Sequence, residues 1–125
     1  MIIPIYAALF GLLFVFLSIR VIKQRVKNQV AIGDGQHPEL MRTMRVHGNF
    51  AEYVPFALLI MFFLETQTNH SVFIHVLGLA LLAGRLIHAY GVSKTDEELH
   101  FRKIGMILTF IVIISSSVRV LFSYF

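Results

Sequence analysis

The chain is 125 residues long, and 57% of its residues are hydrophobic whereas only 14% are charged. Its mean hydropathy of +0.75 is far too high for a soluble domain of this length, so the composition predicts a single-domain integral membrane protein. The formal net charge of +4 fits contact with anionic lipid headgroups and requires no nucleic-acid partner, and the absence of cysteine excludes disulfides and thiolate metal sites.

The first apolar run predicts a membrane-spanning helix over residues 2–22, close to the ~20 residues that cross the hydrocarbon. Pro4 stands in its first turn, where a missing backbone N–H does little harm. Four basic residues close the run: Arg20, Lys23, Arg25 and Lys27. Glycines and a proline over residues 33–38 then predict a loop.

Residues 38–64 predict a second helix whose first half is polar and whose second half is apolar. At 100° per residue, a group of polar side chains falls within about a third of its circumference. They are Arg42, Arg45, Asn49, Glu52 and Tyr53. Such side chains are costly on a helix that enters a membrane, and by default they mark a functional site. The alternative is that they only reach into headgroup water.

Two further spans complete the chain. Residues 65–71 predict a polar turn, residues 72–90 a third span and residues 102–122 a fourth. The third span ends in a polar segment that contains Arg85, His88 and Tyr90, and Arg102 opens the fourth. The sequence therefore predicts an all-α bundle of four membrane-spanning helices in one domain, residues 1–125.

The positions of the basic residues predict the orientation. They cluster in the first and third connections, whereas the middle connection and the N-terminal segment have none and only Arg119 lies near the C-terminus. The first and third connections should be cytoplasmic and both termini non-cytoplasmic. The polar ends of all four spans then lie at one membrane depth. The residues that meet there are Arg25, Arg45, Asn49, Glu52, Arg85, His88, Tyr90 and Arg102.

An excess of arginine over carboxylate suggests an anionic ligand, because guanidinium groups match carboxylates in bidentate geometry. Glu52 would then balance a ligand ammonium or hold an arginine in place. The alternative is a structural Arg–Glu network that ties the helices together. His47 lies opposite Arg45 on its helix and serves a helix contact or a neighbouring subunit. The histidines show no metal-ligand spacing, so no metal site is expected.

The motif Arg45-x-x-x-Asn49-x-x-Glu52-Tyr53-x-Pro55 resembles that of the MAPEG family, the small four-helix proteins of eicosanoid and glutathione metabolism. Gly84-Arg85-x-x-His88 and Arg102 also fall where that family has them, so the resemblance covers most of the chain. It implies a homotrimer that binds glutathione, as thiol co-substrate, between neighbouring subunits. The residues that would bind the tripeptide are Arg25, Arg45, Asn49, Glu52, Tyr53 and His88.

The resemblance further implies a glutathione-dependent transferase or peroxidase that acts on hydrophobic electrophiles delivered through the bilayer. Arg102 would lie beside the sulfur as the catalytic residue, since a nearby guanidinium lowers a thiol pKa. Further candidate site residues are Arg42, His47, Arg85 and Tyr90. The length is typical of the bacterial branch, which predicts an inner-membrane location.

The chain departs from the family pattern at one position, and two rival functions remain. Well-studied synthases of the family carry a tyrosine where this chain has Val92. Some members bind lipid without catalysis, so a lipid-binding or scaffold protein of the same fold is the first rival. A small multidrug transporter is the second, and it is disfavoured because residues 1–19 lack the carboxylate that proton coupling needs.

Overall fold

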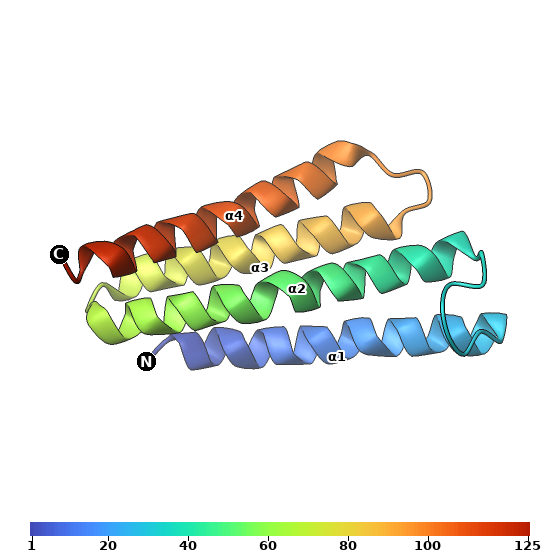
Figure 1. Cartoon of the computed structure of the whole chain (residues 1–125), viewed down its shortest axis with the longest axis horizontal. Helices are drawn as coiled ribbons and strands as arrows, with labels where there is room; N and C mark the ends of the chain where they lie inside the picture. Colours follow the sequence, from blue (N-terminus) through green and yellow to red (C-terminus); the bar gives the residue numbers. More distant parts are fainter.

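The computed structural model describes all 125 residues and contains four α-helices and no β-strand (Figure 1). The helices are α1 (Ile3–Asn28), α2 (Pro38–Gln67), α3 (Ser71–Ser93) and α4 (Leu99–Phe122). Each is long and apolar enough to cross a membrane. The prediction of an all-α, integral membrane four-helix bundle is confirmed.

The helices extend beyond the predicted spans. α1 runs to Asn28 instead of 22, because the Lys, Arg and Gln residues that follow its apolar run are good helix formers. The polar turn predicted at 65–71 is shorter, since α2 continues to Gln67. Glu65 lies within α2, and its carboxylate accepts hydrogen bonds from the backbone N–H groups of Ile2 and Ile3. The last turn of α2 therefore caps the start of α1.

The four helices lie side by side and alternate in direction (Figure 1). Both termini and the α2–α3 turn lie at one end of the bundle, which we call the turn end. The α1–α2 and α3–α4 connections lie at the other, which we call the basic end because most basic residues are near it. α1 packs mainly against α2, and α3 against α4. The core between them includes Phe10, Phe50, Val54, Leu81 and Val112.

Glycines bring α3 and α4 into close contact near the basic end. A Cβ atom built on Gly105 would lie 2.6 Å from the carbonyl oxygen of Gly84 and 2.6 Å from the Cβ of His88. Any side chain at this position would force the helices apart. Because Gly105 has no side chain, the start of α4, which carries Arg102, can approach His88.

Candidate functional site

A cavity of about 160 Å³ lies between α2, α3 and α4 toward the basic end. Its lining is Arg45, Asn49, His88, Val92, Arg102 and Met106. Three helices contribute to it, which matches the expectation that polar groups from separate spans share one membrane depth. The structure thus brings together Arg45, Asn49, His88 and Arg102, four of the residues that the sequence singled out.

Arg85 lies behind this cavity, and its side chain is almost wholly buried, with 2% of the residue exposed. Its guanidinium donates to the Oδ1 atom of Asn49 and, at 3.4 Å, to the Oγ1 atom of Thr109. No carboxylate pairs with it, and its Nε–H group has no acceptor. A buried charge without a counter-ion is costly. The positive charge of Arg85 is therefore uncompensated in the isolated protomer.

The contacts of Arg85 determine which polar atoms remain for the cavity. A guanidinium can only donate, so Oδ1 of Asn49 is occupied as an acceptor and the amide N–H groups remain free. Arg85 Nη2 also lies 3.3 Å from Nδ1 of His88, which must act as the acceptor. The neutral ring then carries its proton on Nε2. Asn49 and His88, like Arg45 and Arg102, can therefore offer N–H donors to a ligand.

Glu97, in the α3–α4 connection, links two arginines of the basic end. Its Oε1 atom lies 2.9 Å from Nη1 of Arg42 and 2.6 Å from Nη2 of Arg102, and its Oε2 atom accepts from Nε of Arg102 at 2.8 Å. Arg42 also donates to the carbonyl oxygen of Val92. The Glu97 side chain is only 5% exposed. Burial opposes its ionisation, but the hydrogen bonds from Arg42 and Arg102 outweigh it and lower the pKa of Glu97.

Arginine still exceeds carboxylate after these pairs are counted. Four guanidinium groups lie at or behind the cavity, on Arg42, Arg45, Arg85 and Arg102, and the carboxylates that pair with them are those of Glu52 and Glu97. Four positive charges against two negative charges leave an excess of two. A preorganised set of donors with this excess is suited to an anion.

The polar face of α2 also reaches the outer surface of the protomer. Nη2 of Arg45 lies 3.7 Å from Oε1 of Glu52, and both side chains are more than half exposed, at 58% and 55%. Tyr53 packs edge-on against Phe110 of α4, with ring centroids 5.7 Å apart. Glu52 and Tyr53 therefore border the cavity-lining group without lining the cavity themselves.

Other candidate residues lie away from the cavity. The guanidinium of Arg25 donates to the carbonyl oxygens of Val30 and Gly33 and so holds the α1–α2 connection. His47 faces α1, where its Nε2 atom lies 3.0 Å from the Ser18 hydroxyl. This contact bears out the helix-contact alternative for His47.

Tyr90 faces the α3–α4 connection at the surface. Its ring packs edge-on against Phe101, and the amino group of Lys94 lies 4.4 Å above its centroid. Tyr90 is thus separate from the cavity, whose lining includes Val92. No group of three metal-ligating side chains occurs in the chain.

Sequence reasoning did not single out Glu97, Thr109 or Met106. Glu97 is one of three consecutive acidic residues before α4, and nothing in the local pattern shows which of them turns inward to the arginines. Thr109 lies one turn after Gly105 on α4, facing Arg85. The sequence could have indicated Thr109 only by its helical spacing from Arg102 and Gly105, which places all three on one face of the helix.

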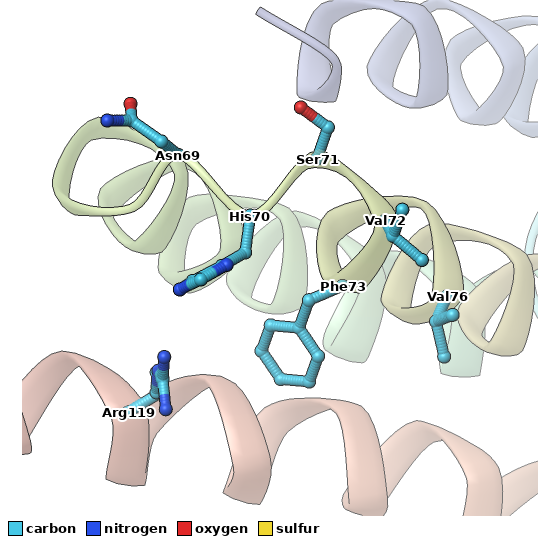
Figure 2. A pocket seen from close by; sticks show the side chains of 7 residues that line it. All are labelled: Asn69, His70, Ser71, Val72, Phe73, Val76 and Arg119. Carbon is cyan, nitrogen blue, oxygen red and sulfur yellow. The ribbon is translucent and has the colours of Figure 1, made fainter.

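A larger cavity, of about 700 Å³, lies at the opposite end of the bundle. Figure 2 shows the side chains that line it, which come from the α2–α3 turn, the start of α3 and the end of α4. None of the predicted site residues is among them. Its larger size does not make it the predicted site, because none of Arg42, Arg45, Arg85 and Arg102 lines it.

The chain is similar to known proteins over most of its length. The model of the MAPEG family matches residues 3–122. The inner membrane protein YecN of Escherichia coli strain K12 is 38% identical over 109 residues, which cover 87% of this chain and 82% of that protein. The YecN protein of Escherichia coli strain CFT073 matches to the same extent.

The ion pairs of Glu97 with Arg42 and Arg102 predict a pH-dependent contribution to the stability of the fold. An acid whose pKa is lowered by folding stabilises the fold above its ordinary pKa, here 4.5, and this contribution is lost as pH falls through the lowered value. We expect Glu97→Gln to lower the Tm in detergent at neutral pH. The difference from the wild type should shrink progressively below pH 4.5.

The neighbouring Glu98→Gln variant is the control, because the Glu98 side chain is 69% exposed and its ion pair is with the exposed His100. It should leave the Tm nearly unchanged at neutral pH. A Glu97→Gln deficit that persists undiminished in acid would show that charge pairing is not its cause.

Proposed function

The chain belongs to the MAPEG family, and on that premise we propose that it is a glutathione-dependent transferase or peroxidase of the bacterial inner membrane. The observation that carries this proposal is the cavity lined by Arg45, Asn49, His88 and Arg102, with the unpaired guanidinium of Arg85 behind it. The proposed second substrate is a hydrophobic electrophile that reaches the protein through the bilayer.

Glutathione fits the charge of this end of the bundle. It has two carboxylates, one ammonium group and a thiol, so its net charge is −1 as the thiol and −2 as the thiolate. The arginine excess described above is also two charges. The carboxylates would take the guanidinium and amide donors of Arg45 and Asn49, and Glu52, whose pair with Arg45 is long at 3.7 Å, would then turn to the ammonium group.

The proposed chemistry depends on the ionisation of the thiol. A free thiol with a pKa of ~8.5 is mostly protonated at neutral pH, and a nearby cation lowers that value. With Arg102 beside the sulfur, the thiol loses its proton to solvent and the thiolate attacks the electrophilic carbon. A carbon–sulfur bond forms as the leaving group departs with its electron pair, or as a proton adds to the product.

Glu97 limits how much of the Arg102 charge reaches the sulfur. It occupies the Nε and Nη2 donors of Arg102, which leaves the Nη1 side of the guanidinium available. Glu97 therefore orients Arg102 while it neutralises part of its charge. Removing the Glu97 carboxylate should strengthen the field at the sulfur, even though it lowers the stability of the fold.

An apolar cavity offers a place for the electrophile. It measures about 250 Å³ and lies between α1 and α2, with Phe10, Phe14, Phe50 and Pro55 among its lining residues. Gly11 also lines this cavity and faces open space, since a Cβ atom built on it would meet no atom within 4 Å. A hydrophobic molecule could enter here from the lipid, on the α1 side of the polar α2 face.

We propose a homotrimer as the functional unit. The half-exposed Arg45 and Glu52 side chains would face lipid in a lone protomer, which is unfavourable for charged groups within the membrane. A second copy packed on this face would cover them and could supply Arg25, which lies outside the cavity of its own protomer.

The particle mass in mild detergent checks the trimer. We expect three copies of the 14.3 kDa chain, because only an assembly encloses the polar face of α2. Glu52→Leu should weaken the assembly, whereas the exposed Glu39→Leu should not. Monomers alone in the wild-type preparation would contradict a site between subunits.

The role of Arg102 can be tested by the ultraviolet absorbance of bound thiolate. Arg102→Leu should abolish the thiolate signal that glutathione develops with the wild type, while affinity falls less than in Arg45→Ala. Arg102→Lys should keep part of the signal, because lysine keeps the positive charge but lacks the planar set of donors of a guanidinium. Glu97→Gln should keep or increase it. An undiminished signal in Arg102→Leu would remove Arg102 from the chemistry.

A further inference from the structure

The turn end of the bundle carries a second polar cavity that the proposed reaction does not use. The 700 Å³ cavity adjoins one of about 510 Å³, and Asn69, His70 and Arg119 line both. In Figure 2 the side chains of His70 and Arg119 point toward one another, from the start of α3 and from α4, and the ring of Phe73 lies beside them. The continuous space is therefore open between two helices.

The charge of Arg119 is unpaired. It is the one arginine or lysine at the turn end, and it takes part in none of the ion pairs of the chain. The acidic residue at this end, Glu65, is occupied by the backbone N–H groups of Ile2 and Ile3 at the start of α1. Nothing within the chain neutralises the Arg119 guanidinium.

The start of α3 adds free donors to the same cavity. Its N-cap residue, His70, provides no side-chain cap. The Ser71 N–H donates to the carbonyl of Asn69 and the Ile74 N–H to that of His70, whereas the N–H groups of Val72 and Phe73 have no acceptor. Unpaired N–H groups at a helix N-terminus favour an anion. Val72 and Phe73 line the same cavity as the unpaired Arg119.

Apolar side chains lie beside these polar groups. Val72, at 78% exposed, and Val76, at 55% exposed, extend from the cavity along the outer surface of α3. Phe122 closes the adjoining cavity on α4. Cationic and N–H groups at the end of membrane-spanning helices, followed by apolar side chains toward the bilayer centre, match an amphiphile with an anionic head.

We propose that this cavity binds the phosphate headgroup of an anionic phospholipid from the leaflet at the turn end. The phosphate accepts from Arg119, His70 and the first N–H groups of α3, while the acyl chains lie along Phe73 and Val76. A free phosphate would use the same donors but would gain nothing from the apolar surface. The site is separate from the cavity at the basic end and does not depend on glutathione binding.

Native mass spectrometry of the delipidated protein in detergent tests this site, with phosphatidylglycerol or phosphatidylcholine of matched chains as the probe. We expect the wild type to prefer phosphatidylglycerol, and Arg119→Gln to reduce the preference about fivefold, the effect of one arginine near an anionic surface. Arg119→Lys should keep most of it. Lys103→Gln, at the other end of the same helix, is the control and should change nothing.

Val72→Glu provides a second test that does not remove Arg119. An acidic residue in the first turn of a helix is favourable, so this variant should fold, and its carboxylate should compete with the headgroup. Val72→Gln is its uncharged control and should retain the preference. Equal uptake of both lipids by the wild type, an equal loss in Lys103→Gln, or full competition by glycerol phosphate would each overturn the proposal.

Discussion

The burial of Arg85 without a carboxylate partner is the constraint on which the basic end of the protein depends. Within a membrane-spanning bundle a guanidinium must be given acceptors, and the chain gives it the Asn49 amide, the His88 ring and the Thr109 hydroxyl. Each of these acceptors is thereby fixed in orientation. The same contacts that satisfy Arg85 leave Asn49 and His88 with N–H donors for the cavity, and they leave a positive charge for a ligand to neutralise.

Glu97, Gly84 and Gly105 determine where Arg102 lies in the site. The close approach of α3 and α4 at Gly84 and Gly105 brings the first turn of α4 beside His88. Glu97 then joins Arg102 of α4 to Arg42 of α2 through a single carboxylate. The Arg102 guanidinium is held at the cavity by a residue of the connecting segment, so changes in that segment should alter the site without any change in the helices.

Much of this arrangement follows from the sequence. Four apolar runs and the distribution of basic residues predicted the bundle and the end at which the polar groups meet, and Arg45, Asn49, His88 and Arg102 do line one cavity. Helical periodicity could not show which arginines are paired, because pairing depends on how the α3–α4 connection folds. The residues alone grouped Tyr90 with the site by its depth, and depth does not specify the direction in which a side chain points.

The central claim is that the arginine excess at the basic end binds glutathione. Calorimetric titration of the detergent-purified protein with glutathione tests it most directly. We expect saturable binding of one glutathione per protomer that weakens as salt is added, because the ligand carboxylates are held by partly exposed guanidinium groups. The absence of any binding at millimolar glutathione, with the assembly intact, would contradict the account.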